Sequence, residues 1–226
     1  MPDTLSQPKI QALSWIGFTL NDYIQMFDLT DSDLTRKILD YNAGCASFTQ
    51  ELALNNPGVM ACDNLYQHSP AVLWDKLNHL AMNSNAIKAL LTPAFINERA
   101  QHIPQMMAHY AKVGSTHYLN SKIENLIFPD EAFHLALSAY ALFTVTDHLS
   151  ETYHINAILE LLRVANEVRI FPLTNLQGKV SPYIGTILSG LQQQGLDTEI
   201  KTRQFQPHIP AQAMLRVWSA QCKVAP

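Results

Sequence analysis

The chain has 226 residues, of which 47% are hydrophobic, and a formal net charge of -4 at pH 7. This length suits one α/β unit with a sizeable core, so we expect residues 1–226 to form a single domain. An acidic chain has no overall positive field to hold a phosphate backbone, which argues against a nucleic-acid partner. The chain shows neither a secretory signal nor an apolar run of roughly 18 residues, so it predicts a cytoplasmic protein without a membrane span.

The three cysteines, Cys45, Cys62 and Cys222, are widely spaced and form no C-x-x-C pair. Their number and spacing predict reduced thiols instead of a disulfide framework or a zinc site. His102 and His109 can share a helix face, but two imidazoles lack the third ligand that a metal site needs. We therefore expect no metal centre.

Apolar residues recur near helical spacing from Ile10 to Phe27, which predicts a long helix within an N-terminal helical cap over residues 1–30. Lys37–Tyr41 then forms a short apolar run, followed by a turn and by a helical pattern at 47–54. Val59–Cys62 gives a second short strand. This order predicts a β-α-β unit with a right-handed crossover.

Helical spacing returns from Pro70 to Val113, and Pro93 and Pro104 are placed to begin or break helices. The segment is long for a simple crossover between strands. We therefore treat residues 67–113 as a helical insertion, and we expect it to carry substrate contacts.

The second half of the chain again alternates between strands and helices. Helices are expected at Glu151–Ala165 and Ser181–Gln194, the latter ended by Gly195. The expected strands are Thr116–Asn120, Phe133–Ala139, Val168–Phe171, Leu196–Lys201 and Ala213–Trp218. Together with the first two strands they predict an α/β fold with a doubly wound, mostly parallel, seven-stranded sheet of the Rossmann-like kind.

Polar residues follow the first two predicted strands. In a doubly wound sheet, ligands bind outside the carboxyl ends of the strands, where the strand order reverses. The segment Asp40–Gly44 ends the first strand, and its glycine allows a close backbone approach. Asp63 follows about twenty residues later at the tip of the second strand, where an acid can accept hydrogen bonds from both hydroxyls of a ribose. A turn glycine has the same spacing in many folds, so this pattern alone leaves a purely structural role open.

Four segments carry a wider resemblance: DYIQMFDLTDSDLTRKILDYNAGCASFTQELA, ACDNLY, HYLNSKIENLIFPDEAFHLALSAYALF and HINAILELLRVANEVRIFPLTNLQGKVSPYI. In their order and spacing they resemble the class I S-adenosylmethionine-dependent methyltransferases, and among these an uncharacterised bacterial subgroup. The resemblance implies the methyltransferase fold, S-adenosylmethionine as the cofactor and S-adenosylhomocysteine as its product. It also implies methyl transfer to a small-molecule acceptor.

The resemblance assigns the methionine part of the cofactor to Asp40–Gly44 and the ribose hydroxyls to Asp63. It also implies that Tyr23, together with Phe27, closes over the cofactor. Further residues flank the adenine or form the floor near the sulfonium. The full set of cofactor-binding residues that it implies is Tyr23, Asp40, Tyr41, Asn42, Ala43, Gly44, Asp63, Asn64, Leu65, Lys122, Ile123, Ser138 and Ala139.

Two positions depart from the family pattern. Of the G-x-G-x-G loop only Gly44 is kept, and Asn42 and Ala46 stand at the other two positions, which predicts a looser hold on the cofactor. Lys122 stands where the family commonly has an acid, and an ammonium group cannot accept a hydrogen bond from the adenine amino group. Backbone carbonyls are then the expected acceptors.

The resemblance requires no dedicated catalytic residue, because the methyl donor is already activated and the protein mainly aligns the acceptor. If the acceptor is an alcohol or a phenol, a general base assists the transfer. Tyr140, His148 and His154 are the candidates near the strand tips, although a structural role suits each of them better.

Two alternatives to an active methyltransferase stay open. A catalytically degenerate protein of the same fold, acting as a cofactor-binding sensor or an interaction module, is favoured by the reduced glycine loop and by Lys122. A nicotinamide-dependent enzyme is disfavoured, because the chain lacks the G-x-G-x-x-G pattern that binds a pyrophosphate.

Arg169 falls within a predicted interior strand, so its guanidinium group needs a buried partner. Glu160 and Glu167 are the nearest acids in the sequence. We expect a structural ion pair with one of them.

Overall fold

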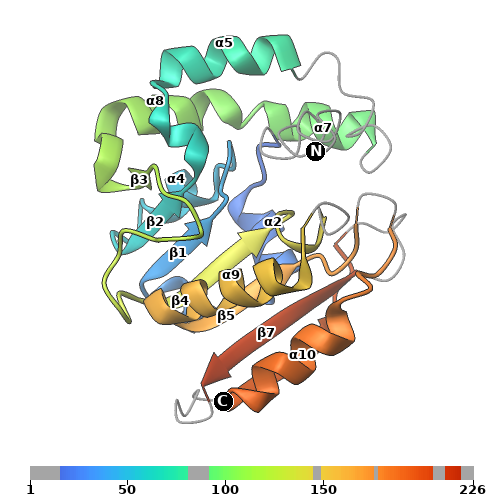
Figure 1. Cartoon of the computed structure of the whole chain (residues 1–226). Helices are drawn as coiled ribbons and strands as arrows, with labels where there is room; N and C mark the ends of the chain where they lie inside the picture. Colours follow the sequence, from blue (N-terminus) through green and yellow to red (C-terminus); the bar gives the residue numbers. More distant parts are fainter. Residues whose placement is uncertain (1–15, 81–91, 145–148, 176–177, 206–211, 220–226) are drawn as a thin grey trace.

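A mixed seven-stranded sheet forms the centre of the protein in the computed structural model, which describes residues 16–80, 92–144, 149–175, 178–205 and 212–219 (Figure 1). The strands are β1 (Ile38–Tyr41), β2 (Val59–Cys62), β3 (Tyr118–Leu119), β4 (Phe133–Ala139), β5 (Ala165–Phe171), β6 (Leu196–Thr202) and β7 (Ala213–Ser219). Every strand that the sequence predicts is present. The largest differences are in β3, which is reduced to two residues, and in β5, which begins three residues earlier than expected.

The strand order is β3-β2-β1-β4-β5-β7-β6, so the chain winds outward from β1 to β3 and then returns to place β4 on the other side of β1. The ladders from β3 to β5 are parallel. The expected mostly parallel sheet is wrong at the other edge, where β7 runs antiparallel to both β5 and β6. The reason is that only ten residues join β6 to β7, whereas the crossover between parallel strands needs about a dozen or more.

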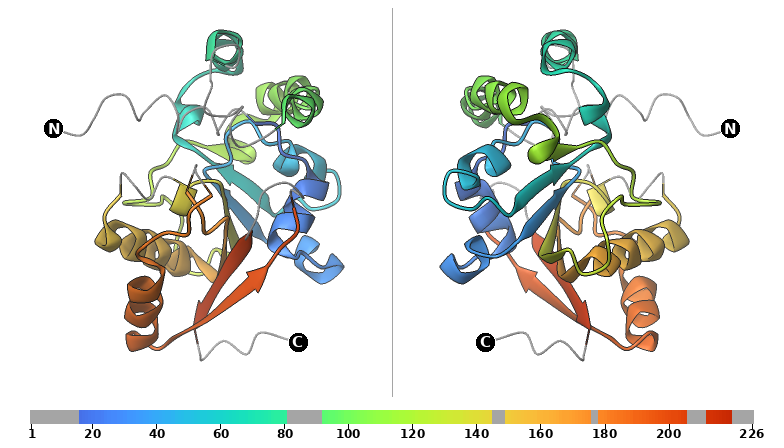
Figure 2. Two further views of the ribbon diagram at one scale, coloured as in Figure 1. Left: turned by 90° about the vertical axis from the view of Figure 1, so that its right-hand side faces the viewer. Right: turned by 90° about the vertical axis from the view of Figure 1, so that its left-hand side faces the viewer.

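Helices cover both faces of the sheet, as Figure 2 shows. One face carries α2 (Leu20–Phe27), α3 (Asp31–Leu34) and α4 (Phe48–Leu52), and the other carries α9 (Glu151–Val164) and α10 (Ile184–Gln193). Apolar side chains fill both layers. On the first face Phe27 lies in one cluster with Leu137, and on the second face Ile158 lies in one cluster with Val168.

The N-terminal helix begins later than predicted. Residues 1–15 lie outside the described part of the chain, and 16–19 are not helical. The Thr19 hydroxyl accepts a hydrogen bond from the Asp22 amide, and the Asp22 carboxylate accepts one from the Thr19 amide, so a capping box starts α2 at Leu20. Before it, Gly17 passes so close to the carbonyl oxygen of Arg99 that a side chain there would overlap it. The apolar spacing before Thr19 therefore reflects buried, non-helical chain.

The insertion is helical, as expected, over its described residues. It contains α5 (Pro70–Leu80), α7 (Pro93–Ala100) and α8 (Ile103–Val113), and the prolines stand in the first turns of their helices. Short 3-10 helices, η1 (Asn64–Gln67) and η2 (Gly114–Thr116), flank it. α8 packs against α4, and α5 lies on α8 above the sheet (Figure 1). Among the described helices none is long and apolar enough to span a membrane.

Two smaller predictions are confirmed. Gly195 follows α10 with φ of 77°, the left-handed conformation expected where a helix ends. Cys45 and Cys62 are free and buried, whereas Cys222 lies outside the described residues.

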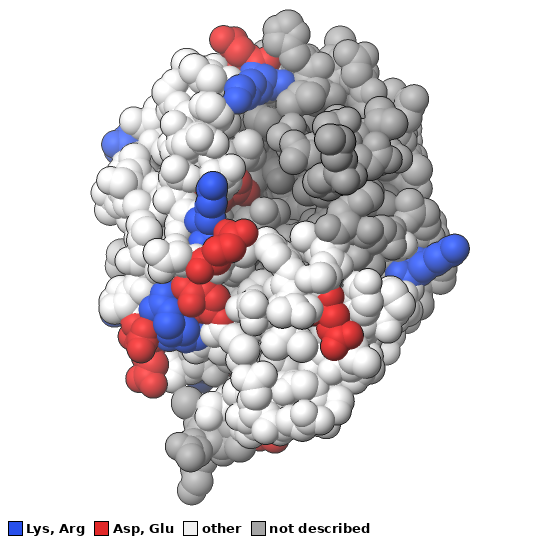
Figure 3. All heavy atoms as spheres, in the orientation of Figure 1, with Lys and Arg blue, Asp and Glu red and all other residues white. Residues whose placement is uncertain are grey.

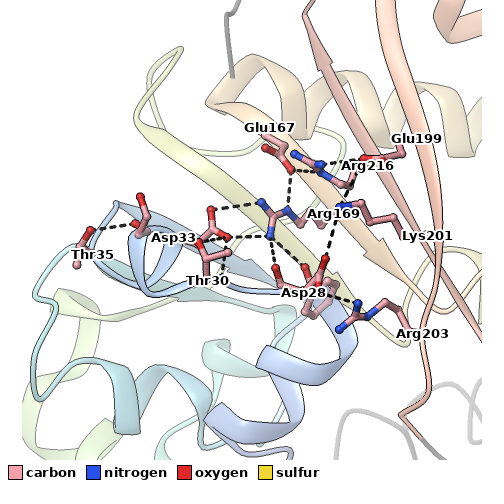
Figure 4. Close-up of polar contacts among 12 residues, drawn as sticks. Asp28, Thr30, Asp33, Thr35, Glu167, Arg169, Glu199, Lys201, Arg203 and Arg216 are labelled. Atoms are coloured by element: carbon pink, nitrogen blue, oxygen red, sulfur yellow. Dashed lines mark hydrogen bonds and ion pairs between the residues drawn. The ribbon is translucent and has the colours of Figure 1, made fainter. Parts of the chain in front are cut away.

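Arg169 lies at the centre of a buried ionic network that joins α3 to the antiparallel edge of the sheet (Figure 4). Its guanidinium group contacts Glu167 at 2.6 Å and Asp33 at 3.1 Å, and Arg216 contacts Glu167 at 2.7 Å. The predicted pair with Glu167 is thus confirmed, and Glu160 instead binds Arg163.

Both acids of this network have lowered pKa values. Burial acts to raise the pKa of Asp33, but the hydrogen bonds from Thr30 and the charge of Arg169 outweigh it. Burial likewise acts against ionisation of Glu167, and its hydrogen bonds to Arg216 and Arg169 lower its pKa. The acids and arginines of the network therefore neutralise one another, and we interpret the network as structural.

Candidate functional site

A cavity of about 270 Å³ opens at the carboxyl ends of β1 and β2, beside the point where the strand order reverses. Residues from the loops after β1, β2 and β3 and from the start of α9 enclose it. They are Tyr41, Asn42, Asp63, Asn64, Ser121, Lys122, Ile123, Glu124 and Tyr153. Six of them belong to the set that the sequence assigns to a cofactor. A second cavity of about 440 Å³ shares Ile123, Glu124 and Tyr153 and continues along α9.

The loop after β1 keeps a tight left-handed turn although it has only one glycine. Asn42 has φ of 60° and Gly44 has φ of 57°. Asparagine tolerates this conformation better than most residues other than glycine. The Asn42 amide donates a hydrogen bond of 2.7 Å to the Cys62 carbonyl, which fixes the loop against the end of β2. The missing glycine is thus replaced by a residue that keeps the backbone path.

Asp63 is the central acid of the cavity. It is 4% exposed, and its two carboxylate oxygens accept hydrogen bonds from the Gly44 amide at 2.9 Å and the Leu65 amide at 2.8 Å. Burial raises its pKa to about 6, and the two backbone hydrogen bonds counteract that rise. Among the described residues no cationic side chain forms an ion pair with it. Because a carboxylate offers about four lone-pair sites, Asp63 can accept further hydrogen bonds from a ligand.

Asp40 and Tyr23 form a buried pair beneath this cavity and do not line it. The Tyr23 hydroxyl lies 3.0 and 3.1 Å from the two carboxylate oxygens of Asp40, and the Tyr23 ring stacks on Phe48 at 4.2 Å. Burial raises the pKa of Asp40 well above its usual range, and the nearby charge of Asp63 raises it further. Tyr23 and Phe27 do not line this cavity, because both side chains are packed into the core, and their closing over a ligand stays a prediction.

The other assigned residues lie around the cavity without lining it. Ala43 is 6% exposed within the loop, and Leu65 holds Asp63 through its amide. Ser138 and Ala139 end β4, where Ser138 pairs with Tyr41 in the parallel ladder. The structure therefore brings the predicted segments to one edge of the sheet, with the direct contacts concentrated on the ends of β1 and β2.

Sequence reasoning missed Ser121, Glu124 and Tyr153. The Asn125 amide donates to the Lys122 carbonyl at 3.2 Å, so Lys122–Asn125 is a tight turn, and Glu124 lies within it. The cavity thus has a carboxylate two residues after the lysine that departs from the family pattern. A turn at this place in the sequence had no strong marker, and Tyr153 is placed only by the position of α9 in the fold.

Of the three catalytic candidates, Tyr140 and His154 lie in the described part of the chain. Tyr140 is 5% exposed, and burial raises the pKa of its phenol, which disfavours a role as a general base. His154 is fully buried, and its Nδ1 lies 2.8 Å from the Ser150 carbonyl oxygen; Nδ1 therefore carries the proton and donates it. Its Nε2 has no partner among the described residues. His148 lies outside the described part of the chain.

No known family model matches the sequence. An uncharacterized protein of the archaeon Methanocaldococcus jannaschii is 27% identical over 187 residues, which cover 76% of this chain and 83% of that protein. This relative carries no functional information, and because it is archaeal, the expected bacterial subgroup stays a prediction.

Two solved structures share the fold. PigF, solved with S-adenosylhomocysteine, matches 88% of this chain with 12% identity and a TM-score of 0.50. Phosphoethanolamine N-methyltransferase 1 of Haemonchus contortus, solved with phosphoethanolamine and S-adenosylhomocysteine, matches 100% of the chain with 14% identity and a TM-score of 0.50. The chain spans about half of each structure, 54% and 47% respectively. It therefore has the class I fold of S-adenosylmethionine-dependent methyltransferases.

Proposed function

We propose that this protein binds S-adenosylmethionine in the cavity at the ends of β1 and β2 and transfers its methyl group to a small-molecule acceptor. The carrying observation is Asp63, a buried carboxylate that lines the cavity, is oriented by two backbone amides and has no cationic partner among the described residues. We further propose that the chain works as a single domain in the cytoplasm.

The residues of the cavity fit this cofactor. Asp63 can accept hydrogen bonds from both hydroxyls of a ribose, and its position after β2 is the usual place for that contact in doubly wound folds. Asn42 keeps the backbone path of the turn. Lys122 cannot accept a hydrogen bond from an adenine amino group, but Ser121 and Glu124 line the same cavity and can.

The chemistry assigned to the protein is mainly alignment. S-adenosylmethionine, when bound, supplies an already activated methyl group. Asp63 then fixes the sugar, and the turn at Asn42–Gly44 brings the backbone close to the ligand. The hydrogen bond of Tyr23 to Asp40 fixes the end of β1. Orienting two reactants in this way can supply up to roughly 7–11 kcal/mol of a barrier without a dedicated catalytic residue.

Calorimetric titration with S-adenosylhomocysteine and S-adenosylmethionine tests the proposal. We expect binding of the wild-type protein and a loss of about 100-fold in affinity for Asp63→Ala, because two charge-assisted hydrogen bonds of about 1.5 kcal/mol each are removed. Asp197→Ala is the matched control, since it removes an exposed carboxylate from β6 at the far edge of the sheet. Its affinity should equal that of the wild type.

Equal affinities of Asp63→Ala and the wild type would show that the ribose assignment is wrong. Absence of binding to the folded wild-type protein would overturn the proposed function. That result would favour the alternative, a degenerate member of the fold that acts as an interaction module.

A further inference from the structure

Three buried hydroxyl groups without hydrogen-bond partners among the described residues belong to β4 and to the segment that follows it. Among the described residues, five buried side-chain polar atoms have no partner, and four of them belong to residues between 138 and 154. They are Ser138 Oγ, Tyr140 Oη, Thr144 Oγ1 and His154 Nε2. A buried polar group without a partner costs about 1–3 kcal/mol, so two such groups that line one cavity indicate a place that a polar ligand completes.

Two of these hydroxyl groups line one small cavity. Tyr140 and Thr144, together with Pro172, Thr174, Asn175 and Gln212, enclose a volume of about 10 Å³ at the ends of β4 and β5. Such a volume holds about one water-sized group. The cavity is separate from the one at β1 and β2 and shares no lining residue with it.

The side chain of Tyr140 is held firmly in this position. Its backbone has φ of 50°, and its amide donates a hydrogen bond of 2.6 Å to the carbonyl of Phe171, the last residue of β5. Its ring stacks on Phe18 at 5.1 Å and meets the edge of Phe171 at 5.7 Å. A non-glycine residue in the left-handed region is uncommon, and surrounding contacts must hold it there. The hydroxyl is therefore pre-positioned.

The lining of the cavity selects the chemistry of its ligand. None of its lining residues carries an ionised side chain, so a carboxylate, a phosphate or an ammonium group would be buried there without a counter-charge. Tyr140 stays protonated and donates a hydrogen bond, and the Thr144 hydroxyl can accept one. A single group that accepts and donates at once is an uncharged hydroxyl.

We propose that this cavity is the docking point of the methyl acceptor and that the acceptor carries an uncharged hydroxyl group, held between Tyr140 and Thr144, on an apolar or aromatic body. This inference rests on the proposed function. The cavity lies at the β4–β5 boundary and the cofactor cavity at the β1–β2 boundary, about two strand spacings or roughly 10 Å apart along the same edge of the sheet. In this arrangement the acceptor's hydroxyl would fill the small cavity, and the rest of the acceptor would extend from it toward the cofactor cavity.

The experiment uses phenol as the probe, with toluene, benzoate and benzylamine as matched compounds that lack the hydroxyl or carry a charge. Dissociation constants are measured by NMR titration of the full chain, with and without S-adenosylhomocysteine. We expect phenol to bind at least about tenfold more tightly than the other three. Tyr140→Phe and Thr144→Val should each weaken phenol binding about five- to tenfold, the loss expected for one hydrogen bond.

Thr49→Val is the matched control, because Thr49 in α4 also has a buried hydroxyl without a partner among the described residues and lies outside both cavities. It should leave phenol binding unchanged. Thr144→Val and Tyr140→Phe remove an unsatisfied group without changing the shape of the side chain much, so both variants should unfold at no lower denaturant concentration than the wild type.

The possible outcomes separate the two proposals. If S-adenosylhomocysteine binds but phenol is not preferred, or the two variants bind phenol like the wild type, the cavity holds only a structural water and this inference is overturned while the proposed function stands. If phenol depends on both hydroxyls but S-adenosylhomocysteine does not bind, the acceptor role is overturned together with the proposed function.

Discussion

The protein contains two groups of buried acids, and they differ in what neutralises them. Asp33 and Glu167 face the guanidinium group of Arg169, and their pKa values are lowered (Figure 4). Asp40 and Asp63, at the carboxyl ends of the strands, face a phenol and backbone amides, and burial raises their pKa values. The first group is electrostatically complete within the chain, and the second is not.

The difference distinguishes acids that are paired within the chain from acids that keep the capacity to bind a ligand. A buried ion pair that is satisfied on all sides needs nothing more, whereas a buried carboxylate without a cation keeps hydrogen-bonding capacity at a cost in stability. Strongly perturbed acids in a cavity are candidates for ligand binding. On the face drawn in Figure 3, the described basic and acidic side chains are interspersed, so no broad field of one sign marks a site there. Whether a buried acid has a cationic partner is therefore a better guide to a binding site than the distribution of surface charge.

The largest expected effect comes from removing Arg169, which neutralises Asp33 and Glu167. Arg169→Met leaves Asp33 buried without a cation and Glu167 paired with Arg216 alone, which should lower the free energy of unfolding by about 3–5 kcal/mol in urea titrations at pH 7. Lys201→Met is the control, because that side chain is 34% exposed and its ion pairs should contribute less than about 1 kcal/mol. An Arg169→Met variant with the same free energy of unfolding as the wild type would contradict the structural role of the network.

The two groups should also respond to pH in opposite directions. Asp63 has a folded pKa of about 6 against a usual 3.8, so the folded state binds its proton more tightly, and this contribution to stability is present below pH 3.8 and lost as pH rises through 6. Asp33 and Glu167 have lowered pKa values, so their contribution is present at higher pH and is lost as pH falls through their folded values.

The measurement is the unfolding free energy of the wild type and of Asp63→Asn at pH 4 and pH 7. The free energy of unfolding of Asp63→Asn, relative to that of the wild type, should increase by on the order of 2–3 kcal/mol from pH 4 to pH 7, since asparagine cannot ionise. Asp33→Asn should change in the opposite sense. A pH-independent difference for Asp63→Asn contradicts the raised pKa.

A smaller effect concerns the hydroxyl that supports Asp40. Tyr23→Phe keeps the ring stacked on Phe48 but removes the only side-chain hydrogen bond that Asp40 receives among the described residues. It should cost about 1–2 kcal/mol of unfolding free energy. Phe48→Leu tests the ring stack without touching the hydrogen bond. If Tyr23→Phe proves as stable as the wild type, the pair does not stabilise the end of β1.

The smallest effect is expected at Lys122, the residue that departs most clearly from the family pattern. Its side chain is exposed, and Ser121 and Glu124 provide the acceptors in the same cavity. Lys122→Ala should therefore change the affinity for S-adenosylhomocysteine by less than about threefold, measured by calorimetry. A loss of tenfold or more would mean that the lysine itself contacts the ligand.

The sequence predicted the positions of the strands well because their patterns are local. Val59–Cys62 and Phe133–Ala139 are apolar runs bounded by turn residues, and the structure has strands at the same bounds. The start of α2 was mispredicted because Ile16 and Phe18 continue the apolar spacing while lying in non-helical chain. Their burial depends on tertiary packing, including the contact of Phe18 with Phe95 in the distant insertion.

The candidate site was only partly predictable for the same reason. Asp63 and Asn42 follow strands directly, so strand ends mark them. Tyr153 reaches the cavity from a helix ninety residues beyond Asp63, and Glu124 from a turn between β3 and β4. The antiparallel placement of β7 between β5 and β6 likewise depends on long-range pairing, which no local pattern encodes.

The most direct test of the central claim, that Asp63 forms the centre of a cofactor site, is a crystal structure of the protein grown with saturating S-adenosylhomocysteine. The account predicts the ligand in the cavity at the ends of β1 and β2, with both ribose hydroxyls within hydrogen-bond distance of the Asp63 carboxylate. A well-ordered structure in which that cavity holds no ligand, or in which the ligand lies elsewhere and away from Asp63, would contradict it.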